Sequence, residues 1–173
     1  MYRVLLKPAR FFRHHTVFVQ LWFLPVWLAL GVAKVAISTV SFKSLVPKLG
    51  VSMGVRPWLP LLTASEERRA RRVSQVVQLA ARYTPWESNC FPQVVVARIL
   101  LGIYGIPYCL FFGVRRKPVS GEFDAHAWIA SGKVRVTGRY SFHQYAVVGV
   151  FTTSSLAHHL KAQSPPENRK REP

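Results

Sequence analysis

The clearest helical pattern of apolar positions runs from residue 63 to residue 82. Thr63 stands three residues before Glu66, which is the spacing of a capping box, where each side chain binds the other residue's backbone N–H. Four small or aliphatic residues then recur at helical spacing and form one apolar face: Val73, Val76, Val77 and Ala80. The pattern ends before Pro85, because the residue that precedes a proline avoids the helical conformation.

A second helix is predicted from about Pro92 to Tyr104. Proline is favoured in a first helical turn, which does not need the missing N–H, and Gly105 and Pro107 end the pattern. Three consecutive β-branched valines near its start weaken the pattern slightly. Cys90 therefore lies at the N-terminus of this helix, where the macrodipole and unpaired N–H groups stabilise negative charge.

A β-hairpin is predicted further along the chain. Asp124 to Ala130 alternates small and large residues, and Lys133 to Thr137 alternates again after the turn residues Ser131 and Gly132. If Ser131 and Gly132 form a two-residue turn, Ala130 pairs with Lys133, and the same register places His126 opposite Thr137.

Two further strands flank this hairpin in the sequence. Residues 108–114 are almost continuously apolar, which is typical of a strand buried on both faces, and residues 145–153 form the last predicted strand. Residues 139–144 are predicted as a short loop, and residues 154–162 as a short last helix. The proline- and glycine-rich stretch 41–62 is predicted as a connector with one helical turn at most.

Residues 16–33 carry no charged side chain and follow a basic N-terminal stretch. This pattern allows a signal peptide, a membrane-spanning helix or a helix that docks on the core or on a partner. Gln20 and Pro25 interrupt the apolar run, and apolar positions continue after Lys34, so a docking helix is favoured. Peripheral contact of this helix with a membrane is the second interpretation.

The chain has 173 residues, enough for one domain with a core of its own. Its 24 Lys and Arg against 7 Asp and Glu give a formal charge of +17, which suits acidic peptide, anionic lipid or nucleic acid as partners. No aromatic-basic nucleic-acid motif is present. Half of the residues are hydrophobic, so the chain as a whole does not have a disordered composition.

Cys90 and His126 are the candidate catalytic residues. A cysteine at a helix start favours the reactive thiolate, and a histidine on a neighbouring strand can serve as its base. Cys109, in the apolar run 106–112, is predicted to be an inert buried thiol. We expect both thiols to be reduced, in a cytoplasmic protein.

The chain resembles the bacterial transglutaminase-like cysteine peptidases of lasso-peptide biosynthesis, and more narrowly the stand-alone peptidase half of a split lasso-peptide B protein. The resemblance spans about residues 10–155. The matching segments are Pro85-Trp86-Glu87-Ser88-Asn89-Cys90-Phe91-Pro92-Gln93, Gly105-Ile106-Pro107-Tyr108, Phe112-Gly113-Val114, Ala125-His126-Ala127-Trp128, Val136-Thr137-Gly138 and Tyr145-Ala146-Val147-Val148-Gly149.

This resemblance implies an α+β fold with a transglutaminase-like, papain-like core, in which the nucleophile helix packs on a small antiparallel sheet. Residues 63–162 would form that core, residues 1–62 an N-terminal helical region with its connector, and residues 163–173 a disordered basic tail. It also implies a hydrolase that removes the leader from a ribosomally made precursor peptide before a cyclase closes the macrolactam.

In the implied mechanism Cys90 is the nucleophile, His126 the general base and the Cys90 backbone N–H an oxyanion donor. The family usually carries an aspartate about a dozen residues after the histidine, whereas no acid occurs at residues 136–139. Thr137, Asp124 or a backbone carbonyl could orient the imidazole instead, and the sequence does not choose among them.

The implied partners are the precursor, a separate leader-recognition protein and a lasso cyclase. No cofactor is expected, since the six histidines and two cysteines lack metal-ligand spacing. One alternative is a membrane-associated binding or scaffold subunit with an inactive Cys/His pair. A basic nucleic-acid-binding protein is the other and is least favoured.

Overall fold

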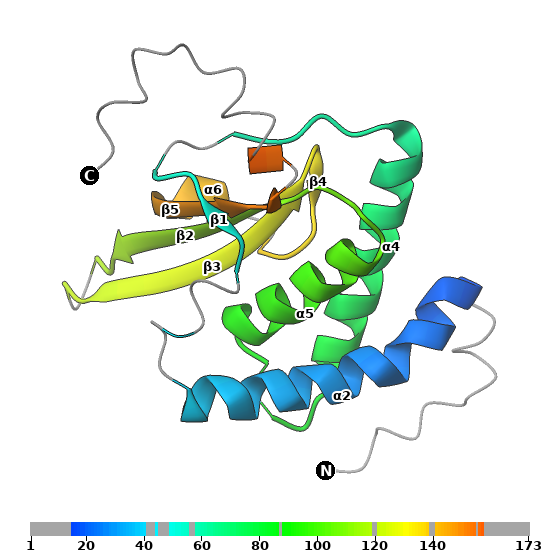
Figure 1. The fold of residues 1–173 in the computed structure, drawn as a ribbon. Helices are drawn as coiled ribbons and strands as arrows, with labels where there is room; N and C mark the ends of the chain where they lie inside the picture. The colour runs from blue at the N-terminus through cyan, green and yellow to red at the C-terminus, as the bar shows by residue number, and fades with distance from the viewer. Residues whose placement is uncertain are drawn as a thin grey trace.

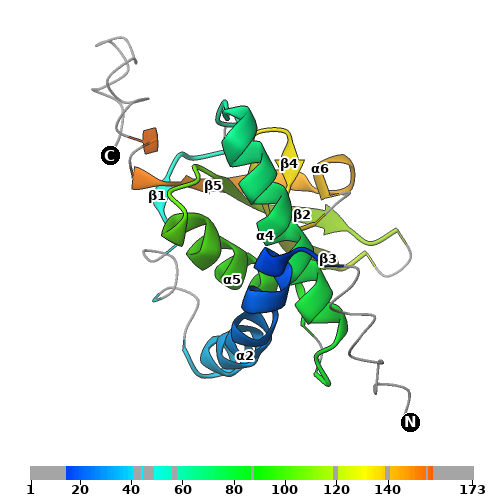
Figure 2. The same ribbon diagram turned by 90° about the vertical axis from the view of Figure 1, so that its right-hand side faces the viewer.

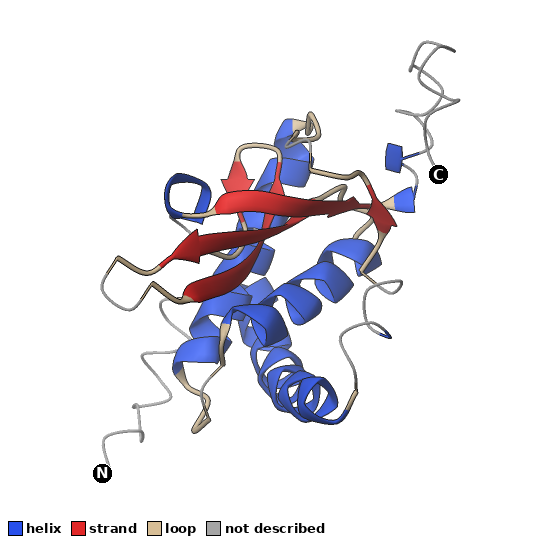
Figure 3. Ribbon diagram, turned by 90° about the vertical axis from the view of Figure 1, so that its left-hand side faces the viewer, coloured by secondary structure: helices blue, strands red, loops and turns tan. Residues whose placement is uncertain are grey.

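The computed structural model describes residues 15–40, 44, 49–55, 58–86, 88–118, 121–138, 141–154 and 156–157. Its elements follow in the order α2 (Val17–Thr39), β1 (Val51–Ser52), α4 (Ala64–Arg82), α5 (Cys90–Ile103), β2 (Cys109–Arg116), β3 (Phe123–Ser131), β4 (Val134–Arg135), α6 (Ser141–Gln144) and β5 (Ala146–Thr152). Figure 1 shows α2, α4 and α5 gathered on one side of the sheet, and Figure 3 separates helices from strands by colour. The α+β class expected from the sequence is confirmed.

Helix α4 begins as its sequence predicts. The Thr63 backbone N–H donates to Glu66 Oε2 at 2.7 Å, and the Glu66 N–H donates to Thr63 Oγ1 at 3.3 Å, which completes the capping box. The Thr63 hydroxyl also donates to this carboxylate, and its hydrogen bond holds the pKa of Glu66 below the usual value. Behind this cap the valine face is fully buried against the rest of the core.

The sheet is antiparallel throughout, with strand order β1-β5-β2-β3-β4. Successive side chains of a strand point to opposite faces. Leu110, Ala127 and Ile129 belong to the core shared with the helices, whereas Phe111 and Trp128 form a second cluster with the other face. Because β3 alternates, His126 lies on the same face as Trp128, away from the helical layer.

Helix α2 packs on α4 and α5, and Figures 1 and 2 show it at the outer edge of the helical layer. Its inner face is tied down by tryptophan N–H groups: Trp22 Nε1 donates to the Tyr104 hydroxyl at 2.6 Å, and Trp27 Nε1 donates to the Tyr83 carbonyl at 3.1 Å. The prediction of a docked helix is correct for this face. The helix runs past Lys34, and by length and composition alone it could cross a membrane.

The hairpin register was predicted incorrectly. Ser131 pairs with Val134 and Ala130 with Arg135, so the turn is formed by Gly132 and Lys133. Gly132 has a φ of +55°, and a positive φ at the first central position is typical of the type II′ hairpin turn. Alternation alone cannot locate the turn, because a shift of the partner strand by two residues preserves which residues face the core.

Two short elements were also missed. Val51 and Ser52 of the predicted connector form β1, which pairs with Thr152 and Phe151 of β5. Residues 141–144 of the predicted loop form the one-turn helix α6. Most of the predicted last helix, the basic N-terminal stretch and the predicted tail lie outside the described residues.

Candidate active site

Cys90 is the first residue of α5, and its thiol is partly exposed. Asn89 precedes it in an extended conformation, with φ −61° and ψ 176°, and its side chain makes no capping hydrogen bond. The first helical turn contains no acidic residue. The unpaired backbone N–H groups of this turn therefore lie at the Cys90 end of α5 without a competing carboxylate in that turn.

The loop before Cys90 is held at both ends. The Thr84 hydroxyl donates to the Ala81 carbonyl at 2.9 Å and lies 2.8 Å from Ser88 Oγ. Gln93 Nε2, from the first turn of α5, donates to the Ser88 carbonyl at 2.8 Å. These contacts fix the approach of the chain to Cys90 from the end of α4.

His126 sits in β3 directly opposite Gly113 of β2. Its imidazole stacks on the Tyr145 ring, with centroids 4.9 Å apart and planes at 24°, and more distantly on Trp128 at 6.0 Å and 22°. A Cβ on Gly113 would lie 2.7 Å from the Trp128 ring and 2.8 Å from the Tyr145 Cβ. A side chain at position 113 would therefore push apart the aromatic rings beside the imidazole.

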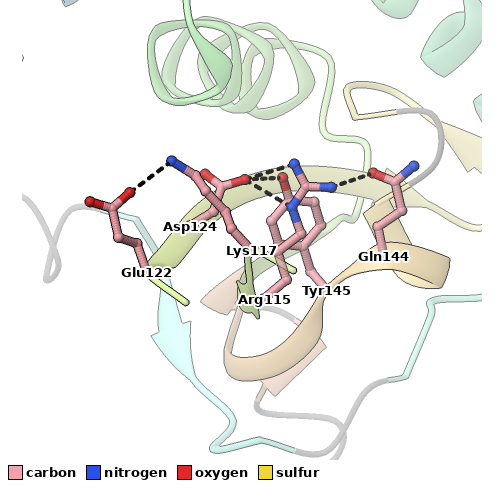
Figure 4. A network of polar contacts seen from close by, with 6 residues as sticks. All are labelled: Arg115, Lys117, Glu122, Asp124, Gln144 and Tyr145. Carbon is pink, nitrogen blue, oxygen red and sulfur yellow. Dashed lines mark hydrogen bonds and ion pairs between the residues drawn. The ribbon is translucent and has the colours of Figure 1, made fainter. Parts of the chain in front are cut away.

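Tyr145 also belongs to a polar network (Figure 4) that converges on one carboxylate oxygen. Asp124 Oδ2 accepts the Tyr145 hydroxyl at 2.9 Å and Arg115 Nε at 2.9 Å, and it lies 2.8 Å from Arg115 Nη2. The Arg115 guanidinium also lies over the Tyr145 ring, 4.7 Å from its centroid. The Tyr145 hydroxyl, followed by Arg115, holds the pKa of Asp124 below its usual range.

The surroundings of His126 favour its neutral imidazole form. Burial lowers the pKa of His126, the negative charge of Asp124 opposes this shift, and Arg115 adds to it. Burial and the hydrogen bond to Asp124 raise the pKa of Tyr145, and the charge of a Cys90 thiolate contributes to the same shift. Tyr145 is therefore in contact with His126 and within electrostatic range of Cys90.

The structure does not join Cys90 and His126 directly. Within the described part of the chain, neither the Cys90 thiol nor the His126 ring nitrogens make a hydrogen bond. Cys90 belongs to the helical layer, whereas the His126 side chain lies on the opposite face of β3. Catalytic hydrogen bonds are often long in ligand-free enzymes and tighten with substrate.

Thr137 does not face His126. The observed hairpin register removes that pairing, and Thr137 Oγ1 accepts the Ile129 backbone N–H at 3.0 Å from a buried position. Asp124 does share the His126 face, but its Oδ2 oxygen accepts hydrogen bonds from Arg115 and Tyr145. Sequence reasoning missed Tyr145 and Arg115, because only the pairing of β2 with β3 and β5 brings them beside Asp124.

Two open cavities line the side of α4 that faces the hairpin. One, of about 450 Å³, is lined by Arg71, Ser74, Gln75, Gln78, Lys133, Val134 and Arg135. The other, of about 310 Å³, is lined by Gln78, Ala81, Arg82, Gln93 and Gly138. They share Gln78, and the second reaches Gln93, one helical turn after Cys90. We call them together the α4 groove.

The chain belongs to the transglutaminase-like superfamily, whose family model matches residues 36–150. This fold is typical of cysteine peptidases and transglutaminases. No curated protein and no solved structure matches the chain. Among the described residues no group of three His, Cys, Asp or Glu side chains could hold a metal ion.

Proposed function

We propose that this protein is a cysteine peptidase that removes the leader from a lasso-peptide precursor. The observation that supports it most is Cys90 at the start of α5, a helix that packs on the strand carrying His126, in a member of the transglutaminase-like superfamily. The narrower assignment to lasso-peptide maturation rests on the sequence motifs around these two residues.

In the proposed reaction His126 accepts the Cys90 proton, and the thiolate attacks the carbonyl carbon at the leader–core junction. The Cys90 backbone N–H donates to the resulting oxyanion. Collapse of this intermediate breaks the C–N bond, His126 returns the proton to the leaving amine, and the leader remains as a thioester. Water, deprotonated by His126, then hydrolyses the thioester and restores the thiol.

The α4 groove supports a peptide substrate with acidic residues. Arg71, Arg82 and Lys133 line it together with glutamine side chains, and among the described residues no acidic side chain lines it. Arg71 is partly engaged by Glu67, at 3.5 Å, across one turn of α4. A cationic groove that ends one turn from the nucleophile suits an extended acidic segment. Charge reversal of Arg82 and Lys133 should therefore raise KM more than it lowers kcat.

The proposed partners are a separate leader-recognition protein, which delivers the precursor, and a lasso cyclase that takes the cleaved core. We propose that the peptidase acts in the cytoplasm. These partners follow from the resemblance to split lasso-peptide systems.

The direct test is mass spectrometry of a candidate precursor incubated with this protein and the leader-recognition partner. A single cut by wild type that is absent with Cys90→Ala supports the proposal, and Cys109→Ala serves as the matched thiol control. An intact precursor in every sample, with the partner shown to bind the leader, contradicts it.

A catalytically inactive binding subunit is the second candidate. The separation of Cys90 and His126 onto different sides of β3, and the lack of an acid at residues 136–139, favour it. In that case wild type and Cys90→Ala would bind the precursor equally and leave it intact.

A further inference from the structure

We infer that Tyr145 is the positioning residue for His126, and that Asp124 and Arg115 act on the imidazole by holding Tyr145 in place. This inference rests on the proposed role of His126 as general base. It supplies the orienting function for which the sequence offers no acid at residues 136–139.

The contacts define a connected unit. The Tyr145 ring stacks on the imidazole at 4.9 Å, while its hydroxyl donates to Asp124 Oδ2 at 2.9 Å. Arg115 bonds the same oxygen and also covers the Tyr145 ring. Both the ring and the hydroxyl of Tyr145 are thus fixed, so the ring presents a set plane to His126.

Two backbone features make this unit rigid. Arg115 of β2 pairs with Asp124 of β3. Two residues away along each strand, Gly113 pairs with His126, so these four positions share one face of the sheet. Tyr145 enters between α6 and β5, and the absence of a Cβ at Gly113 leaves room for it beside Trp128. A ring held in this way restricts rotation of the imidazole and excludes water from one of its faces.

The charged and titratable groups beside His126 are Asp124 of the same strand, Arg115 of β2 and Tyr145, which directly precedes β5. Cys90 of α5 acts electrostatically on Tyr145. Replacing Asp124 by asparagine leaves the Arg115 charge uncompensated, which should lower the pKa of His126 further. Removing the Tyr145 ring readmits water, which should raise that pKa toward its ordinary value.

The test combines kinetics with NMR titration of the His126 imidazole in the full chain, assigned with His126→Gln. We expect Tyr145→Leu to lower kcat about 10- to 100-fold with KM within about twofold, and to raise the pKa of His126. Tyr145→Phe keeps the ring and should lose only about three- to tenfold in kcat. Tyr104→Phe removes a tyrosine hydroxyl bonded to α2 and is the matched control.

Circular dichroism melts identify variants that fail to fold, and where Tyr145→Leu fails, the His126 titration in Tyr145→Phe decides, because that variant loses the hydroxyl bond that fixes the ring. An unchanged pKa of His126 in folded Tyr145→Leu, or in Tyr145→Phe where Tyr145→Leu does not fold, would overturn the inference. The titration is read without substrate, so it stands even if no peptidase activity is found. A changed pKa of His126 without any peptidase activity would contradict the proposed function and leave the positioning role intact.

An independent observation concerns the outer face of α2, and we propose that this face binds an anionic lipid surface. Six aliphatic side chains, each more than half exposed, recur at intervals of three or four residues: Val17, Leu21, Leu24, Leu28, Val32 and Val35. At 100° per residue they occupy an arc of about 80°, and they extend for about 27 Å along the helix. The buried face of α2 lies opposite.

The charge of the chain and the residue types on the outer face of α2 favour a lipid surface over a protein partner. Helix α2 carries Lys34 and no acidic residue, and the whole chain has a formal charge of +17, so a second copy of the chain would be repelled. The exposed arc contains only valine and leucine, whereas protein interfaces favour aromatic residues, methionine and arginine. Trp22 and Trp27 point inward and bond to Tyr104 and Tyr83. Binding to an anionic lipid surface requires only apolar area and positive charge on the protein.

Co-sedimentation with vesicles tests this proposal. We expect wild type to bind phosphatidylglycerol-containing vesicles at least tenfold more tightly than phosphatidylcholine vesicles, and Leu24→Glu/Leu28→Glu to lose that binding. Leu61→Glu changes a leucine that is 99% exposed outside α2 and serves as control. Equal binding of vesicles by wild type and the double variant would overturn the proposal. It would also be overturned if light scattering showed that wild type is a dimer and the double variant a monomer.

Discussion

Cys90 and Cys109 are the only cysteines of the chain, and their surroundings differ in almost every respect that controls thiol chemistry. Cys90 opens α5 and is partly exposed, while Cys109 opens β2 and is fully buried. Burial raises the pKa of Cys109 to about 11, and its Sγ lies 3.8 Å from Thr152 Oγ1.

The difference follows from the position of each thiol, at the start of a helix or at the start of a central strand. A helix start leaves backbone N–H groups unpaired and turned toward solvent, so it can stabilise an anion. The first residue of a central strand is paired on both sides: Cys109 faces Ala130 of β3 and Thr152 of β5. The same residue type is therefore a candidate nucleophile in one place and a core residue in the other.

The largest expected effect is on peptidase activity. Cys90→Ala should lower kcat at least about 1,000-fold, because the covalent step loses its nucleophile, whereas Cys109→Ala should leave kcat within about twofold. The rate of precursor cleavage, followed by mass spectrometry, measures both. Loss of activity in the folded Cys109 variant, or its persistence in the Cys90 variant, would reverse the assignment.

Alkylation should distinguish the two thiols in the native protein. With its pKa near 11, Cys109 has a thiolate fraction about 300-fold below that of an ordinary thiol at neutral pH, and burial excludes the reagent as well. Iodoacetamide should therefore label Cys90 first, and Cys109 only after unfolding. Peptide mapping after timed quenching reads the two rates, and comparable labelling of both in the native state would contradict the structure.

The pH profile tests the base that serves Cys90. Because the pKa of His126 lies below its ordinary value, neutral imidazole should persist as the pH falls through about 6.5. The acid limb of kcat/KM should then begin below that pH and fall about tenfold per unit. Asp124→Asn should move this limb to lower pH still. An acid limb above pH 6.5 would show that another group limits the reaction.

The smallest effect is on stability. Cys109→Ala should lower the free energy of unfolding by about 1–3 kcal/mol, because it leaves a small cavity in a packed cluster. Cys90→Ala should change it by less than about 0.5 kcal/mol at its partly exposed site. Urea denaturation followed by tryptophan fluorescence gives both values, and a larger loss at Cys90 would indicate a structural role for that thiol.

Local sequence determined the long helices α4 and α5 and the two thiol environments. The capping box of Thr63 and Glu66, and the placement of Cys90 before Pro92, depend on residues within one turn of each other. The strands β2, β3 and β5 could also be placed from alternation and apolar runs. Such signals can be read without the tertiary structure, because they arise from neighbouring residues.

Only the tertiary structure decided the hairpin register, the pairing of β1 with β5 and the unit of Tyr145, Asp124 and Arg115. These features join residues that are distant in the chain, and alternation is unchanged by a shift of two residues. Likewise, the apolar sequence of α2 does not say which of its faces is covered. The packing of α4 and α5 on the inner face leaves the outer one exposed.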